Sequence, residues 1–176
     1  AKGLDSLNVP YLDLVKWYQQ VEGQSKYPLY ALGGNHWSEY CGTLAGDTLL
    51  GFMEMQLHAE INRYHVRKVK YPVAPSPIDD DINLGMNLLL PIQNAPMAYP
   101  EIEWQGIPRR FRVLSVGDSF YFKAFTELTV QSFQQSHFWF YFRELYLQGQ
   151  EQPFTNDKVD LLLEVESQDV ILLYLA

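Results

Sequence analysis

Hydrophobic residues along the chain recur with two alternating spacings, which predict strands and helices in turn. Short apolar runs of the strand type are followed by segments in which apolar residues return every third or fourth position. The predicted strands are 8–12, 27–32, 66–73, 111–116, 137–147 and 170–176. The predicted helices are a first one that ends at Val21, then 38–62, 82–90, 118–133 and 154–167. This alternation predicts an α/β fold with a mainly parallel sheet flanked by helices.

Two segments add detail to this fold. The last one, 170–176, is an unbroken apolar run (Val-Ile-Leu-Leu-Tyr-Leu-Ala), which is typical of a strand buried on both faces of a parallel sheet. We therefore expect a single domain over 1–176 that is part of a larger chain and incomplete at both ends. The stretch 71–100 holds most of the prolines and is expected to be largely irregular, apart from its short helix.

Composition excludes several classes of protein. With 47 % hydrophobic and 19 % charged residues, the 176-residue chain is neither disordered nor a coiled coil. A net charge of −8 argues against nucleic acid as a partner. No apolar run reaches the roughly 18 residues of a membrane span, and Cys41 alone cannot form an internal disulfide. The aromatic content of 15 % suits clefts that stack against flat ligands such as sugar rings.

A candidate nucleophile follows the predicted strand 111–116. Gly117, Asp118 and Ser119 lie where this strand gives way to a helix. At the carboxyl edge of a parallel sheet, such a turn exposes a serine hydroxyl in the crevice where α/β proteins bind ligands. Backbone N–H groups of the first helical turn then point at a developing oxyanion. The alternative is that Asp118 or Ser119 only caps the helix.

A serine nucleophile needs a base, and His36 is the best candidate among the four histidines. His36 lies between a predicted strand and a helix that Ser38 is expected to cap, although a plain polar turn would have the same pattern. His58 and His65 are seven residues apart, which fits a solvated polar face better than a metal site. His137 begins an aromatic segment and is expected to be structural.

These two motifs resemble known blocks of one enzyme superfamily. Gly117-Asp118-Ser119 after an apolar strand looks like the first block of the SGNH hydrolases. The turn that contains His36 and Trp37 resembles the Asp-x-His-Trp segment of the alginate O-acetyltransferase branch. In that branch the histidine segment precedes the serine, as it does here. The resemblance covers most of the chain and implies an SGNH-hydrolase-like sheet with the flavodoxin-like three layers.

The resemblance implies acetyl transfer to or from a polysaccharide hydroxyl. Ser119 would attack the acetyl ester, His36 would take and return the proton, and the Ser119 amide would help to hold the oxyanion. The family carboxylate stands two residues before the histidine, where this chain has Gly34. Asn35 cannot supply that negative charge. This departure has three possible explanations. A carboxylate distant in sequence replaces the missing one, or the activity is weak, or the protein is a non-catalytic relative that still binds glycan.

Further residues are candidate oxyanion or substrate contacts. They are Gly117, Asp118, Asn35, Trp37, Arg143 and Tyr174. Arg143 could equally be a surface arginine on an aromatic strand, and Tyr174 could simply pack in the sheet.

Three functions therefore stay open at this point. The leading one is acetyl transfer or acetyl-ester hydrolysis on a periplasmic or extracellular polysaccharide. A catalytically silent glycan-binding domain and a small-substrate esterase are the alternatives. The expected partner is a carbohydrate or acetylated polysaccharide, and the chemistry needs neither a cofactor nor a metal. The oligomeric state does not follow from the sequence.

Overall fold

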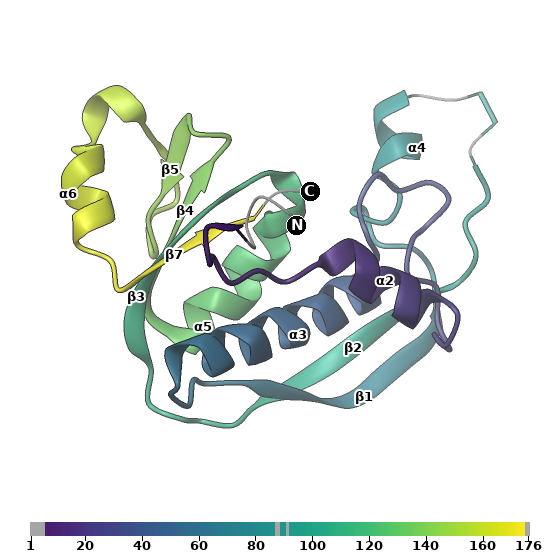
Figure 1. The fold of residues 1–176 in the computed structure, drawn as a ribbon. Coiled ribbons are helices and arrows are strands. Elements are labelled where there is room, and N and C mark those ends of the chain that lie inside the picture. The colour runs from purple at the N-terminus through teal and green to yellow at the C-terminus, as the bar shows by residue number, and fades with distance from the viewer. Residues whose placement is uncertain (1–5, 87–88, 91, 175–176) are drawn as a thin grey trace. The chain divides into compact units, whose positions relative to one another are not determined.

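The computed structural model describes residues 6–86, 89–90 and 92–174. These residues form two compact units, whose helices and strands are labelled in Figure 1. The first unit comprises Ala1–Ala59 and Tyr64–Glu103, and the second comprises Glu60–Arg63 and Trp104–Ala176. The prediction of a single domain stays a prediction.

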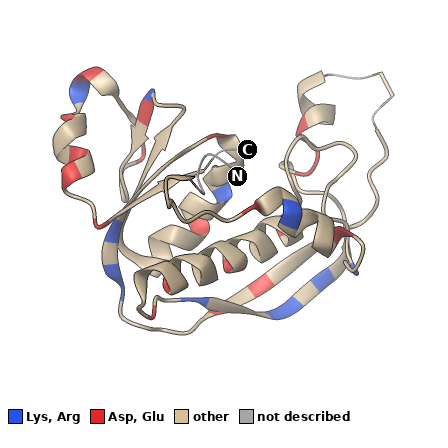
Figure 2. Cartoon of the chain, viewed as in Figure 1, with Lys and Arg blue, Asp and Glu red and all other residues tan. Residues whose placement is uncertain are grey.

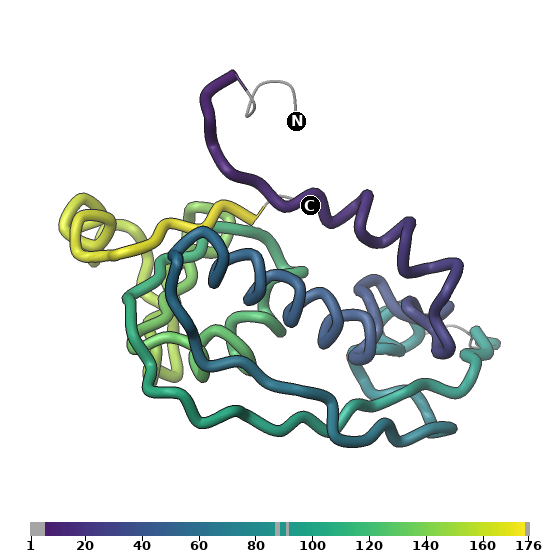
Figure 3. The backbone as a smooth tube through the Cα atoms, turned by 60° about the horizontal axis from the view of Figure 1, so that its bottom comes forward, coloured from purple at the N-terminus to yellow at the C-terminus, as the bar shows by residue number. Residues whose placement is uncertain are grey.

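A long helix and a two-stranded sheet form the centre of the first unit. The helix is α3 (Glu39–Leu57), and the sheet pairs β1 (Tyr64–Val73) with β2 (Met97–Trp104). Two shorter helices, α2 (Leu14–Glu22) and α4 (Asp81–Met86), complete the unit. Helix α3 runs along the two strands in both views (Figures 1 and 3). The Tyr64 hydroxyl ties β1 to α3 by donating to the Thr43 carbonyl at 2.6 Å.

Ser38 caps α3, as the sequence predicts. Its backbone is extended and its hydroxyl oxygen accepts from the Cys41 N–H at 3.1 Å. Cys41 itself is fully buried on this helix, and burial raises the pKa of its thiol to about 12. The helix ends earlier than predicted, because His58 adopts a left-handed conformation with φ 47° and closes it after Leu57.

The second unit is built on a five-stranded sheet. Its strands are β3 (Arg110–Gly117), β4 (Phe133–Phe140), β5 (Glu144–Tyr146), β6 (Phe154–Thr155) and β7 (Val170–Leu173). Their order is β6-β5-β4-β3-β7, with β3 parallel to both of its neighbours. The β4–β5 and β5–β6 pairs are antiparallel. The α/β class is therefore correct, whereas the sheet is mixed rather than mainly parallel.

Helical segments cover both faces of this sheet. Tyr121 and Phe125, in the helical segment after β3, pack their rings against Phe138 of β4. The preceding residue, His137, bonds to Glu164 in α6 (Leu161–Glu166). Because successive strand residues point to opposite faces, the two helical segments lie on opposite sides of the sheet. The second unit therefore has the layer order helix, sheet, helix.

Three predicted helical or strand segments of the second unit differ in detail. The helix 118–133 is a 3₁₀ turn (Ser119–Tyr121), a π-helical stretch (Ala124–Thr129) and a short α5 (Val130–Ser132). The aromatic strand 137–147 is a hairpin, because the chain reverses between β4 and β5. The helix 154–167 is reduced to α6, preceded by β6 and the 3₁₀ turn Asn156–Lys158.

The predicted strands near the two ends are also corrected. Residues 8–12 form no strand, and 27–32 keep only a single bridge between Tyr30 and Trp37. Strand β7 is not buried on both faces, because Ile171 and Leu173 are exposed at the sheet edge. Residues 175–176 of that predicted strand lie outside the described residues.

One further prediction for the first unit needs correction. Helix α2, which the sequence predicts, exposes Val15 and leaves Trp17 half-buried. The stretch 71–100 is less irregular than predicted, because it includes the first residues of β2 as well as α4.

Strands β1 and β2 carry charges of opposite sign, and Figure 2 marks the basic and acidic positions by colour. Arg67 and Lys70 on β1 both pair with Glu101 on β2, and these two bonds hold the pKa of the Glu101 carboxyl below its ordinary value. Such exposed pairs contribute little to stability, because solvent and salt screen them. Among the described residues, no helix has both the length and the apolar character of a membrane span.

Candidate functional site

His36 lies in a short turn and contacts a carboxylate that is distant in sequence. Its Nδ1 is 3.2 Å from Oδ2 of Asp81, the first residue of α4. The other carboxylate oxygen of Asp81 accepts the backbone N–H of Asn35 at 2.8 Å. Both groups are half-buried, with side-chain exposures of 24 % for His36 and 35 % for Asp81. Asp81 therefore holds the turn at two points, the backbone N–H of Asn35 and the imidazole of His36.

This contact determines which ring nitrogen of His36 carries the proton. An ionised carboxylate can only accept hydrogen bonds, so Nδ1 of His36 must be the donor to Asp81. The lone pair of the neutral ring is then on Nε2. This is the tautomer that a general base requires, and a carboxylate on Nδ1 also stabilises the imidazolium that forms when the base takes a proton.

Two glycines allow the turn to approach the acidic segment. A Cβ on Gly34 would lie 3.0 Å from the Asp79 carbonyl oxygen, and one on Gly33 would lie 2.7 Å from Oδ1 of Asp80. The Gly33 carbonyl accepts the Ile82 N–H at 2.9 Å. Neither glycine has a positive φ, so the turn requires them for space rather than for backbone conformation. The side chain missing at Gly34 makes room for Asp79–Asp81.

Asparagines hold the same turn from the other side. Asn94 accepts the Gly33 N–H at 2.6 Å and donates to Oδ1 of Asp80, also at 2.6 Å. Asn83 donates to the same Asp80 oxygen at 2.6 Å and bonds twice with the backbone of Ile92. A carboxylate that accepts several bonds keeps its position, and Asp80 therefore fixes the segment that carries Asp81.

The first acidic residue of the segment anchors it to the sheet. Asp79 is only 1 % exposed, and its Oδ2 accepts from the Tyr99 hydroxyl on β2 at 2.5 Å and from the Ser76 hydroxyl at 3.0 Å. Burial and this bond to Asp79 raise the pKa of the Tyr99 hydroxyl. The members of Asp79–Asp81 therefore have separate roles, since the first anchors the segment to β2, the second braces the turn, and the third contacts His36.

Ser119 lies in the second unit, directly after the central strand β3. Asp118 caps the helical segment, because its Oδ1 accepts the Phe120 N–H at 2.9 Å. Of the two residues that could cap the helix, Asp118 is the one that does so. Ser119 is the first helical residue and is half-buried. Position 117 needs a residue without a side chain, because a Cβ there would lie 2.9 Å from the carbonyl oxygen of Tyr174. The group that approaches Gly117 is thus the backbone of the residue that follows β7, and not a bound ligand.

Three parallel strands of the second unit end at the same edge. Because β7, β3 and β4 are parallel, the residues that follow them meet there. Tyr141, after β4, donates its backbone N–H to the Gly117 carbonyl at 2.9 Å, and Arg143 is exposed in the same turn. Tyr174, after β7, is buried with its ring 5.4 Å from that of Tyr121, so it packs in the core.

The remaining sequence candidates have local roles. Trp37 is half-buried and bridges to Tyr30, while Asn35 holds Asp81 through its backbone. His65 pairs with Glu103 on the exposed strands, and His58 closes α3. Over the part of the chain that the structure describes, no group of three or more His, Cys, Asp or Glu residues could hold a metal ion.

His137 forms a second histidine–carboxylate pair, but in the core. It is 6 % exposed, with Nδ1 2.7 Å from Oε1 of Glu164 and Nε2 2.8 Å from the amide nitrogen of Gln135. The Gln135 amide nitrogen can only donate, so Nε2 of His137 accepts from it and both ring nitrogens are engaged. This agrees with the structural role that the sequence predicts.

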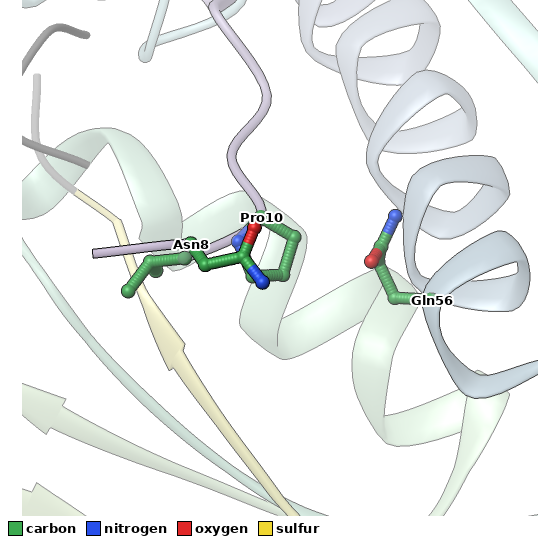
Figure 4. A pocket seen from close by; sticks show the side chains of 4 residues that line it. Asn8, Pro10 and Gln56 are labelled. Atoms are coloured by element: carbon green, nitrogen blue, oxygen red, sulfur yellow. The ribbon is translucent and has the colours of Figure 1, made fainter. Parts of the chain in front are cut away.

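One hollow of the first unit is lined by residues that do not belong to the His36 turn. It measures about 360 Å³ and is lined by Asn8, Val9, Pro10 and Gln56. Figure 4 shows Asn8 and Pro10 on the N-terminal segment and Gln56 on α3. Its lining contains no nucleophile and no titratable side chain, so it has no means to carry out catalysis.

Comparison with known proteins finds similarity among solved structures only. No protein-family model matches the chain, and no curated protein matches it in sequence. A structure described as the O-acetyltransferase domain of Pseudomonas putida AlgJ aligns with 98 % of this chain and 61 % of its own length. The alignment has 14 % sequence identity and a TM-score of 0.48. At that level the likeness says nothing about activity, which has to follow from the residues of the site.

Replacing Gly33 tests the packing of the turn. Gly33→Ala is expected to lower the free energy of unfolding by about 1–3 kcal/mol, because the new Cβ must displace hydrogen-bonded side chains. Gly23→Ala is the matched control. A Cβ there meets nothing within 4 Å, and the local φ of −70° suits alanine. This control should raise stability by about 0.4–1 kcal/mol. Equal effects of the two changes in urea unfolding would contradict the packing described.

Proposed function

We propose that this chain transfers acetyl groups to or from a polysaccharide, with Ser119 as the nucleophile and His36 as the general base. The observation that carries the proposal is the Asp81–His36 bond. It supplies the carboxylate that Gly34 leaves out of the usual motif. Without such a partner the resemblance to the SGNH acetyltransferases would lack one member of its triad.

The proposed reaction has two halves. Ser119 Oγ attacks the carbonyl carbon of an acetyl ester while His36 Nε2 takes the hydroxyl proton. The donor's ester C–O bond then breaks, and His36 returns the proton to the leaving oxygen, which leaves an acetyl group on Ser119. In the second half a sugar hydroxyl gives its proton to His36 and attacks the acetyl carbon. The bond between the acetyl group and Ser119 Oγ then breaks, and His36 returns the proton to Ser119 Oγ. Water in place of the sugar would release acetate, which is the esterase outcome.

Asp81 is a positioning residue in this scheme. It holds Nδ1–H of His36, so that Nε2 is the basic nitrogen, and its charge favours the imidazolium that each half-reaction forms. The Ser119 amide is proposed to donate to the oxyanion. We place the reaction outside the cytoplasm, because the proposed acceptor is a periplasmic or extracellular polysaccharide. These assignments name no cofactor, since acyl transfer of this kind proceeds with side chains alone.

Asp81→Asn tests the positioning role. The amide can still accept the Asn35 N–H but would turn its NH₂ group toward Nδ1 of His36, which favours the wrong tautomer. The turnover number with a chromogenic acetyl ester is expected to fall by about 10²–10⁴-fold, with KM little changed.

Asp160→Asn is the control for Asp81→Asn. Asp160 caps α6 through a bond to the Leu163 N–H at 3.0 Å. Asparagine caps a helix as well as aspartate does, so activity should stay at the wild-type level. Full activity in Asp81→Asn would mean that His36 needs no carboxylate.

Paired substitutions test whether Ser119 and His36 act together. Ser119→Ala and His36→Ala should each remove nearly all serine-dependent ester cleavage, and the double variant should be no slower than either single one. Such non-additivity is expected because a base without its nucleophile has no proton to take. Multiplicative effects, or equal rates in Ser119→Ala and wild type, would rule out the shared mechanism. Glycan binding without any turnover would favour the silent glycan-binding domain.

A further inference from the structure

A network of hydroxyl groups is buried in the core of the second unit and includes the residue two positions after Ser119. The Tyr121 hydroxyl is 2.6 Å from Oγ of Ser115 on β3, and it also bonds to the Thr129 side chain. Oγ1 of Thr129 accepts the hydroxyl of Ser136 on β4 at 2.8 Å. All four residues of this hydroxyl network are 0 % exposed. The reaction proposed above uses none of them.

Tyr121 connects the hydroxyl network to the turn that holds Ser119. Its backbone N–H donates to the Asp118 carbonyl at 3.1 Å, which closes the 3₁₀ turn around Ser119 and Phe120. The Asp118 side chain caps the same turn by accepting the Phe120 N–H at 2.9 Å. Ser119 therefore lies between a capping residue and a residue whose side chain is anchored in the core.

Packing fixes the ring of Tyr121 independently of its hydroxyl. The ring centroid lies 5.1 Å from that of Phe138 on β4 and 5.4 Å from that of Tyr174, which follows β7. Burial raises the pKa of the Tyr121 hydroxyl to about 12, so this group stays neutral. Tyr121→Phe would keep the ring contacts and lose only the bonds of the hydroxyl.

The helical segment that carries Thr129 has an unusual conformation. Ala124–Thr129 is π-helical, a conformation that is rare and frequently found at functional sites. Thr129 is the last residue of this stretch, and its side chain links Tyr121 to Ser136. The hydroxyl network therefore joins four elements, which are β3, the Ser119 turn, the π-helical stretch and β4.

Stability alone does not account for four buried hydroxyls. Replacing both partners of a buried hydrogen bond by apolar groups of the same shape can be nearly neutral, so phenylalanine and alanine would serve the core equally well. A fully bonded polar network instead rigidifies the groups that it joins. Rigidity matters at Ser119, since a nucleophile has to be held within about 0.5 Å of its productive position.

We propose that Tyr121 is a positioning residue for Ser119 and acts through the hydroxyl network. The proposal rests on the proposed function, because it takes Ser119 as the nucleophile. Bonded to Ser115 on β3 and to Thr129 on the helical segment, Tyr121 keeps the Ser119 turn in a constant position at the end of β3. Loss of its hydroxyl lets the turn shift, and a shift of about 1 Å at reacting atoms lowers a rate by about 10²-fold.

Tyr121→Phe and the double variant Ser115→Ala/Tyr121→Phe test this role. The single variant takes away one partner of the Ser115 hydroxyl and is expected to lower the melting temperature, whereas the double variant removes both partners and should restore it. The turnover number with a chromogenic acetyl ester should nevertheless fall about tenfold or more in both, with KM little changed. A turnover number that recovers together with the melting temperature would show a purely structural role and overturn the proposal.

Tyr146→Phe is the matched control. The Tyr146 hydroxyl bonds to Glu144 at 3.2 Å, and its ring packs on Phe138 as that of Tyr121 does, but it lies on β5 in the antiparallel part of the sheet. This control loses a hydroxyl from the same aromatic cluster and should keep the wild-type turnover number. An equal loss of turnover in Tyr146→Phe and Tyr121→Phe would contradict a specific role of Tyr121.

Amide hydrogen exchange, measured by NMR, separates this role from the proposed reaction because it needs no turnover. The backbone amides of residues 120 and 121 bond within the Ser119 turn. In the double variant they should exchange about tenfold faster than in wild type, while the amides of α6 exchange at the wild-type rate. Faster exchange in a protein that turns over no acetyl ester supports the hold on the turn and contradicts only the reaction. Unchanged exchange, or an unchanged turnover number in an active enzyme, overturns the proposal.

Discussion

The contact between Asp81 and the His36 turn is the constraint on which the proposed chemistry depends. One carboxylate accepts a backbone N–H from Asn35 and a ring N–H from His36, so the turn and the imidazole are positioned by the same group. The turn packs closely on Asp79–Asp81, since a Cβ at position 33 or 34 would lie within 3.0 Å of atoms of that segment. In the proposed mechanism Asp81 takes the place of the carboxylate that position 34 does not supply.

In the second unit, close packing and helix capping likewise determine the residues at the end of β3. Gly117 has no side chain because Tyr174 passes close by, Asp118 caps the helical segment, and Ser119 begins it. The parallel neighbours of β3 bring the hairpin tip to the same edge. Local requirements of packing and capping thus account for the residues that precede Ser119, and they leave the hydroxyl network after it as the feature that stability alone does not explain.

Elements whose signals are local can be predicted well from the sequence. Strand β3, the Ser38 cap and the strand β1 each follow from a few neighbouring residues. The hairpin at 137–147 escapes prediction because its turn contains Tyr141 and Phe142 in place of the Asn-Gly that marks such turns. Asp81 escapes prediction as the partner of His36 because the two are 45 positions apart. The only hint is the run of three aspartates at the start of a short helix, which has the same pattern as a solvated acidic surface.

The most direct test of the central claim is the tautomer of His36, measured by NMR on protein with ¹⁵N-labelled histidine. We predict that neutral His36 carries its proton on Nδ1, with a downfield proton resonance, and that Asp81→Asn removes both features. His58 and His65, which have other surroundings, serve as internal references. A His36 protonated on Nε2 in the wild-type protein, or a spectrum that Asp81→Asn leaves unchanged, would contradict the claim.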